Sequence, residues 1–281
     1  MKNKIHTFLL FALSFSLSMS SCKKDEEPTP AQNNNTDTTT GTEGLTFIEE
    51  TYAIGAATKV QLWAGENLFT GYNYLYVMLK DSLTGLAVKK ATVTLMPMMD
   101  MGSMTHSAPV ENPTITQSVK GKYPCAVVFV MPSTAGTWSL SVMVMNMENG
   151  KSGTALLMPT ITDPSVARMK SFISLIDGSK LFVSLVKPSS PVSGINDCEI
   201  TMHKKDGMYF FADSSFTNEM EPIMTAMGHS SPNNISPVHS GKGHYSGQVN
   251  FSMSGEWTIN FDFYQNGILA DSLTYFETTI P

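Results

Sequence analysis

The sequence predicts an all-β protein: two tandem immunoglobulin-like β-sandwich modules that follow a disordered N-terminal tether. Three observations support this fold class. Apolar residues alternate with period two, short candidate strands are separated by Gly- and Pro-containing turns, and one half of the chain resembles the other. No stretch after residue 45 repeats apolar residues every 3.6 positions, so no helix of appreciable length is expected.

The alternation is clearest in two pairs of segments, 123–131 with 138–144 and 245–253 with 257–263. Side chains of a half-buried strand point alternately to the core and to solvent, which gives this period. A short turn carrying Gly136 or Gly255 joins each pair, so we predict a hairpin in each copy. Further candidate strands are 58–64, 72–80, 91–96, 169–176, 180–187, 197–203 and 268–278.

The internal duplication is carried by aromatic and Met/His positions. Residues 121–142 resemble residues 243–261, and Met104–Ser107 resembles Met227–Ser230. Further upstream we align 79–96 with 185–203, which implies an insertion within 204–221 of the second copy. The prolines at 159 and 164 place the boundary near 158–168, giving modules at 46–160 and 165–281.

The N-terminus has the features of an export signal. Lys2 and Lys4 precede the apolar run 8–19, which is too short to span a bilayer. The small residues before Cys22 resemble the lipobox of bacterial lipoproteins, which implies cleavage after residue 21 and lipidation of Cys22. The alternative is an ordinary signal peptide with an incidental cysteine. Residues 22–45 are polar and predict a disordered tether.

The tract Lys23–Glu27 resembles the acidic export signal of surface lipoproteins in the Bacteroidota. This resemblance implies a protein that is lipid-anchored in the outer membrane and exposed at the cell surface, with a periplasm-facing anchor as the alternative. More than one acyl chain gives a stable anchor.

Composition excludes some functions. The formal net charge is −6, and Arg168 is the single arginine, so the chain lacks the basic stripe of a nucleic-acid-binding protein. It contains no H-E-x-x-H, G-x-S-x-G, C-x-x-C or Gly-rich phosphate loop. We therefore expect a protein that is not an enzyme.

Methionine and histidine cluster at corresponding places in the two copies. Thioether and imidazole groups suit copper, and thioethers need no deprotonation to bind Cu(I). The alternative is that these Met residues only fill the core. The candidate metal ligands are Met98, Met101, Met104 and His106 in the first copy, and Met224, Met227, His229, His239 and His244 in the second.

The segment 227–257 (MGHSSPNN…PVHSGKGHYSGQVNFSMSGEW) resembles the YtkA-like domain, a group similar to the FixH-like proteins of bacterial envelopes. Residues 98–138 match more weakly, because they lack the Gly between Met104 and His106. The resemblance covers about half of each module. It implies an immunoglobulin-like sandwich and a link to copper or heavy-metal handling, and it implies no enzyme.

The leading functional prediction is therefore an envelope lipoprotein that binds copper for homeostasis or delivery. The alternative is a structural or adhesive tandem β-sandwich that binds a protein or glycan, with the aromatic segment 207–216 as its contact patch. Cys125 and Cys198 are expected to be buried small hydrophobic residues. A disulfide between them, or copper ligation, are the alternatives.

Overall fold

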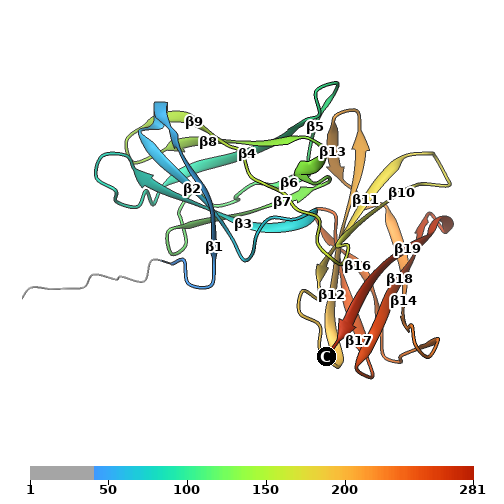
Figure 1. Cartoon of the computed structure of the whole chain (residues 1–281). Coiled ribbons are helices and arrows are strands. Elements are labelled where there is room, and N and C mark those ends of the chain that lie inside the picture. The colour runs from blue at the N-terminus through green and yellow to red at the C-terminus, as the bar shows by residue number, and fades with distance from the viewer. Residues whose placement is uncertain (1–40) are drawn as a thin grey trace, which may run out of the picture. The chain divides into compact units, whose positions relative to one another are not determined.

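The computed structural model describes residues 41–281 (Figure 1). The predicted signal peptide, Cys22 and most of the predicted tether lie outside the described residues. Residues 41–45, which we assigned to the tether, form a turn in which Leu45 donates to the Thr42 carbonyl and Lys122 Nζ donates to the Gly41 carbonyl. Among the described residues, no helix has the length and apolarity that crossing a membrane requires.

The first sandwich contains two antiparallel sheets. One sheet has the order β1 (Thr46–Ala53), β2 (Thr58–Ala64), β3 (Gly71–Asp81), β7 (Lys122–Phe129) and β6 (Val110–Glu111). The other has the order β5 (Thr105–Ser107), β4 (Ala91–Asp100), β8 (Thr137–Asn146) and β9 (Lys151–Leu157). Short 3-10 turns, η1 (Ile54–Ala56) and η2 (Ser133–Ala135), lie between strands.

The second sandwich repeats this plan. Its first sheet has the order β10 (Met169–Ile173), β11 (Lys180–Lys187), β12 (Gly194–Asp206), β17 (His244–Phe251) and β16 (Ile235–Gly241), and β13 (Tyr209–Ala212) also pairs with β12. Its second sheet has the order β15 (His229–Ser230), β14 (Phe216–Met224), β18 (Gly255–Gln265) and β19 (Ile268–Ile280).

The strand order is that of the immunoglobulin fold. When β1 and β10 are set aside as additional N-terminal strands, each module has an A-B-E-D sheet (β2-β3-β7-β6 or β11-β12-β17-β16). The facing sheet is C′-C-F-G (β5-β4-β8-β9 or β15-β14-β18-β19). The predicted all-β fold of two tandem immunoglobulin-like sandwiches is therefore confirmed. The segments 58–64 and 180–187 coincide with β2 and β11.

The two predicted hairpins are wrong. Strands β7 and β8 belong to different sheets, as do β17 and β18. Both strands of each pair turn their apolar residues to the same core, where the rings of Phe129 and Trp138 are 5.1 Å apart and those of Phe251 and Trp257 are 5.6 Å apart. A crossing between sheets produces the same alternation as a hairpin, so periodicity alone does not separate them.

The upstream part of the predicted alignment is also wrong. Asn73 and Asn196 occupy equivalent turns, since each amide binds the backbone of the residues four and two positions before it. Strand β12 therefore corresponds to β3, not to β4. The link between β3 and β4 (82–90) is as long as that between β12 and β14 (207–215), so there is no insertion.

Each sandwich encloses its own core, and the two cysteines are in different ones. Cys125 is buried with Tyr123 and Trp138, whereas Cys198 is buried with Tyr245 and Trp257. Both thiols are free, so the structure contains no disulfide between them. Burial raises the pKa of both thiols, that of Cys198 to about 12. The prediction that they are buried hydrophobic residues agrees with this placement.

Candidate functional site

The predicted metal ligands of the first copy do not share one face of their strands. His106 on β5 lies opposite Met99 on β4, and Met99 lies opposite Trp138 on β8. The predicted ligand Met98 lies opposite Ser107 and so points to the other side of the sheet. Met104 is exposed, and Met101 packs partly against the core. The sequence therefore led us to name Met98 as a candidate ligand, whereas strand register places Met99 beside His106.

The same row of three side chains recurs in the second copy. His229 on β15 lies opposite Met224 on β14, which lies opposite Trp257 on β18. In each copy the histidine Nδ1 is hydrogen-bonded to the carbonyl oxygen of the next residue, at 2.8 Å for His106 and 3.0 Å for His229. We call these two sets the Trp-Met-His rows. The match of 104–107 with 227–230 is borne out by this geometry.

The other predicted ligands of the second copy lie elsewhere. His239 and His244 are on β16 and β17, in the sheet that faces the one carrying His229. His239 packs against the ring of Tyr245, and Met227 is exposed. The five predicted residues therefore do not converge on one point. Among residues 41–281 no group of three or more His, Cys, Asp and Glu side chains is placed to hold a metal ion.

His244 is fully engaged by carboxylates. Its Nε2 is 2.7 Å from Oε1 of Glu111 on β6, and its Nδ1 is 2.7 Å from Oε1 of Glu199 on β12. The hydrogen bond with Glu111 is the main cause that raises the pKa of His244. Neither ring nitrogen is left for a metal, which corrects the prediction for this residue. The contact instead joins the first sandwich to the second.

A second contact between the sandwiches comes from the hairpin of β12 and β13. The Met208 carbonyl accepts hydrogen bonds from Ser107 N at 2.8 Å and Ser107 Oγ at 2.9 Å. The Phe210 ring packs against Phe182 at 5.2 Å and against His106 at 6.4 Å. The predicted contact patch 207–216 therefore supplies an internal contact through Phe210, although Tyr209 and Phe211 remain exposed.

A line of aromatic side chains crosses the outer face of the first sheet. We call it the aromatic track, and its members are Phe47, Trp63, Tyr76, Tyr74 and Tyr72. Phe47 lies opposite Trp63, and Trp63 lies opposite Tyr76. The rings of Phe47 and Trp63, and those of Tyr74 and Tyr76, are 5.1 Å apart. Phe47 and Tyr74 are about half exposed, at 48% and 50%.

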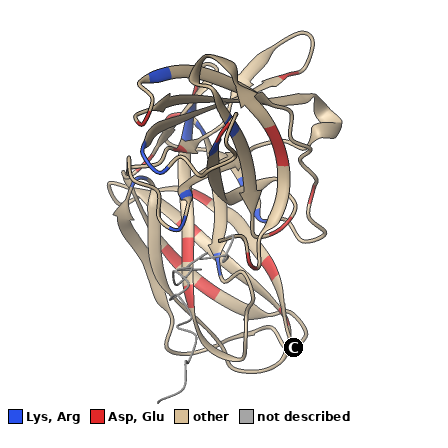
Figure 2. Cartoon of the chain, turned by 90° about the vertical axis from the view of Figure 1, so that its left-hand side faces the viewer, with Lys and Arg blue, Asp and Glu red and all other residues tan. Residues whose placement is uncertain are grey.

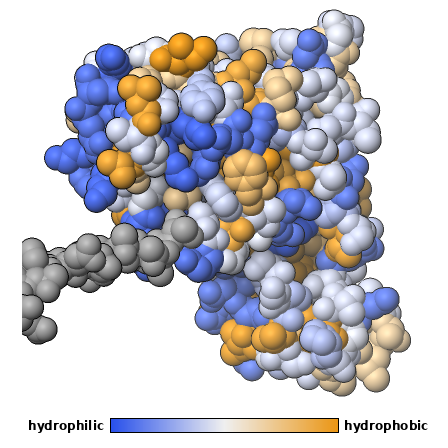
Figure 3. Space-filling view, turned by 60° about the vertical axis from the view of Figure 1, so that its left-hand side comes forward, coloured by the Kyte–Doolittle hydropathy of each residue, from blue (hydrophilic) through white to orange (hydrophobic). Residues whose placement is uncertain are grey.

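Polar groups border the aromatic track. Lys122 Nζ is 5.0 Å from the centre of the Tyr76 ring, and Trp63 Nε1 donates to Gln61. Gln61 in turn donates to Glu50, which forms an ion pair with Lys59 at 2.8 Å. In the face drawn in Figure 3, hydrophobic residues form separate patches among hydrophilic ones. The track is thus a line of ring surface bordered by hydrogen-bonding groups.

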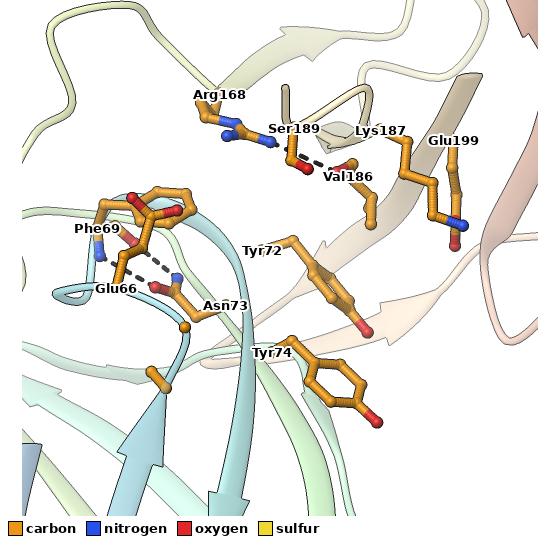
Figure 4. Close-up of a pocket in the computed structure, with 12 residues that line it drawn as sticks. Glu66, Phe69, Tyr72, Asn73, Tyr74, Arg168, Val186, Lys187, Ser189 and Glu199 are labelled. Atoms are coloured by element: carbon orange, nitrogen blue, oxygen red, sulfur yellow. Dashed lines mark hydrogen bonds and ion pairs between the residues drawn. The ribbon is translucent and has the colours of Figure 1, made fainter. Parts of the chain in front are cut away.

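The track ends in a crevice between the two sandwiches (Figure 4). The cavity has a volume of about 450 Å³, and its walls include Phe69, Tyr72 and Tyr74 from the first sandwich with Arg168, Lys187 and Glu199 from the second part of the chain. The Tyr72 ring also contacts His244, at 5.5 Å. Burial, together with the charge of Glu111, raises the pKa of Tyr72 far above its usual range.

The second copy lacks the tyrosines of the track. Strand register places Ile195, Asp197 and Glu199 where the first copy has Tyr72, Tyr74 and Tyr76. The Trp-Met-His rows, in contrast, are present in both copies. The Trp-Met-His rows are therefore common to both sandwiches, whereas the aromatic track occurs in the first sandwich alone. Sequence reasoning missed it, although the alternation in Y-N-Y-L-Y (72–76) was visible.

Charged residues of both signs are mixed over the face drawn in Figure 2, which shows no continuous basic stripe there.

Comparison with known proteins yields no family assignment. No family model and no curated protein matches the chain, so the resemblance to the YtkA-like domain stays a prediction. Solved structures that it resembles include FdeC, an Escherichia coli adhesin (15% identity, TM-score 0.26, 83% of this chain and 66% of that chain).

A second is the D00-D0 domain of intimin (11% identity, TM-score 0.24, 78% of this chain and 99% of that chain). A third is red sea bream transglutaminase (10% identity, TM-score 0.22, 80% of this chain and 31% of that chain). The chain thus spans slightly less than two thirds of the FdeC chain. Similarity at this level assigns no function.

Proposed function

We propose that this chain is a non-catalytic, envelope-displayed adhesive protein that binds a glycan along the aromatic track and into the crevice. The observation that carries the proposal is the row of exposed and half-buried rings on the outer face of one sheet, which continues into a cavity between two sandwiches. Ligand sites commonly lie at domain interfaces and combine apolar walls with a few polar groups.

Exposed rings on a sheet face require a reason, because a solvated face normally carries polar side chains. The track rings do not contribute to the first core, whose aromatic members include Tyr123, Phe129 and Trp138. Their absence from the second copy shows that the sandwich can be built without them. A binding role accounts for both observations.

The shape of the track favours an extended glycan over a globular protein. A protein interface needs about 800 Å² per partner with an apolar centre. The track is one ring wide and is bordered by Lys122, Gln61 and Glu50. A saccharide presents C–H faces that stack on rings and hydroxyls that need such hydrogen-bonding neighbours.

The test is a binding screen of the full chain, in detergent, against immobilised neutral and acidic polysaccharides. We expect Trp63→Ala with Tyr74→Ala to weaken binding about 10-fold or more, at roughly 0.5–1.5 kcal/mol per ring contact. Tyr275→Ala is the matched control, because Tyr275 is an exposed tyrosine with a neighbouring lysine outside the track. The proposal fails if no polysaccharide binds, or if the control and the double variant behave alike.

Copper binding is our second candidate function, now restricted to the Trp-Met-His rows. One observation favours it: Nε2 of His106 is buried without a hydrogen-bond partner, beside the cross-strand neighbour Met99. Buried polar atoms are normally partnered. A thioether and an imidazole are suitable Cu(I) ligands. The second row, with His229 exposed, would be the accessible one.

Competition titration of the full chain with a Cu(I) chelator tests this candidate. Met224→Leu with His229→Ala should lower Cu(I) affinity at least 10-fold, since the pair supplies both donors, whereas His239→Ala should not. Leucine preserves the packing volume of Met224. Unchanged affinity in the double variant would exclude the second row, and no Cu(I) binding at all would remove copper from consideration.

A further inference from the structure

Arg168 is the only arginine of the chain, and it stands at the wall of the crevice. It lies at the end of the link between the sandwiches, one residue before β10. Its carbonyl accepts a hydrogen bond from Leu185 N at 2.9 Å, which ties the backbone of Arg168 to the second sandwich. Its side chain reaches the first sandwich, where the guanidinium carbon is 5.5 Å from the centre of the Phe69 ring.

The loop that carries Phe69 is held on both sides. Asn73 donates to the carbonyls of Phe69 and Gly71 and accepts from Phe69 N, at 2.7, 2.8 and 3.0 Å respectively. Thr70 donates through N to the carbonyl of Thr162 and through Oγ1 to Asp163. The Phe69 ring is therefore a fixed surface on which the guanidinium rests, and the position of Arg168 is set before any ligand arrives.

The guanidinium retains hydrogen-bonding capacity. It donates one long hydrogen bond, from Nη2 to the Val186 carbonyl at 3.4 Å, and within the described residues it forms no ion pair with a carboxylate. The negative charge of Glu66 is close enough to act on the pKa of Arg168, in the direction that raises it, but the two side chains do not form an ion pair. A guanidinium has five N–H donors in a planar fork that matches a carboxylate.

Two of the other charged residues at the crevice, Lys187 and Glu199, are engaged internally, whereas Glu66 forms no ion pair within the described residues. Lys187 Nζ is 3.0 Å from Glu199 Oε2, and Glu199 also binds His244. Arg168 is thus the one crevice residue of the described chain with an unused charge-specific donor set next to aromatic walls. Partial burial lowers the pKa of Arg168, as expected for a cation withdrawn from water, but a guanidinium remains protonated.

We infer that the crevice recognises a carboxylate-bearing saccharide, with the guanidinium of Arg168 binding the carboxylate and Tyr72 and Tyr74 contacting the sugar rings. This inference rests on the proposed function, because it names the chemical class of the glycan. It commits to a carboxylate since the flat fork suits that group, and since a charged hydrogen bond in a half-enclosed site outweighs one made in open water.

The experiment compares oligosaccharides that differ only in this group. Polygalacturonate, alginate and polysialate oligomers, and the methyl ester or carboxyl-reduced form of each, are titrated into the full chain by calorimetry. We expect at least one acid to bind 10-fold or more tighter than its neutral form, with an affinity that falls as salt is raised. Arg168→Gln should abolish this preference, because it should weaken binding of the acid at least 10-fold, to about the level of the neutral form.

Two further variants make the result specific. Arg168→Lys keeps the charge but loses the planar fork, so most of the preference should disappear. Tyr74→Ala should weaken the acid and the neutral form equally. Equal binding of the acid and neutral forms by the wild type, or an acid preference that survives Arg168→Gln, would overturn the inference and leave the proposed function standing. Absence of binding to every oligosaccharide would overturn both.

Discussion

Nε2 of His244 lies 2.7 Å from Oε1 of Glu111, and this contact joins β17 of the second sandwich to β6 of the first. Since Nδ1 contacts Glu199 at the same distance, the imidazole can satisfy both carboxylates only when it carries both protons. Together with the β12–β13 hairpin, this contact helps to hold the two modules against each other.

The stability of this joint should depend on pH with a maximum between about 4.5 and 6.5. The pKa of His244 is raised above its usual 6.5, so its contribution is complete below 6.5 and is lost as pH rises through the raised value. The pKa of Glu111 is lowered below 4.5, so its contribution is complete above 4.5 and is lost as pH falls through the lowered value.

His203 acts in the opposite direction at low pH. Burial lowers its pKa to about 4, so it costs stability as pH falls below 6.5. The measurement is therefore a difference: urea unfolding of the wild type and of His244→Gln from pH 4 to 9, with His239→Gln as control. We expect His244→Gln to lose about 1–3 kcal/mol at pH 6 and much less at pH 9. A loss independent of pH would contradict this assignment.

The hairpin makes a prediction with a matched pair of phenylalanines. Phe210→Ala removes the ring that packs against Phe182 and His106, and should lower the free energy of unfolding by about 1–3 kcal/mol. Phe211→Ala, at the exposed neighbouring position, should change it by less than about 0.5 kcal/mol. Trypsin cleavage after Arg168 should be faster in Phe210→Ala than in the wild type, and unchanged in Phe211→Ala. Equal effects of the two variants would show that the hairpin does not fasten the modules.

The cysteines should be unreactive in the folded protein. Cys125 and Cys198 are buried, and burial raises their pKa, so neither forms thiolate near pH 8. A Cys22→Ser variant, treated with a thiol reagent at pH 8, should show no labelled thiol until denaturant is added and then two. Rapid labelling of either cysteine under native conditions would show that its core opens.

Gly153 on β9 should not tolerate a side chain. A Cβ there would lie 2.6 Å from Ala56 N and 2.8 Å from Gly55 N, both backbone atoms of the adjoining η1 turn. We expect Gly153→Ala to lower the free energy of unfolding by about 1–3 kcal/mol. Gly65→Ala is the control, because a Cβ at Gly65 meets no atom within 4 Å. Thermal denaturation of both variants decides the matter, and a neutral Gly153→Ala would refute the close packing of β9 on η1.

Local sequence patterns predicted which segments form strands, but they did not predict which strands pair. Period-two alternation located strands such as β2 and β11, because it reports which side of a strand is buried. It did not report pairing partners, so β7 and β8 were assigned to a hairpin although they lie in facing sheets. Pairing is a long-range property, and both arrangements bury the same residues.

The candidate site shows the same division. His106 and His229 were predicted as equivalent residues, and register confirms that equivalence. The partners of His244, however, come from strands distant in sequence, and Glu111 carries no local pattern that marks it. The tyrosines of the track do carry a local pattern, but alternating aromatics are expected in a buried strand as well, and only the fold shows which face they occupy.

The pairing of Phe47 with Trp63 has a mechanical consequence. The chain enters β1 at Thr46, which pairs with Ala64 at the edge of the crevice. Force between the N-terminal end of β1 and a ligand on the Phe47 and Trp63 rings would therefore load only the short path from the start of β1 into β2. A ligand that also reached the crevice would extend this path to the second sandwich through Arg168, so the two ends of the track would place different loads on the joint.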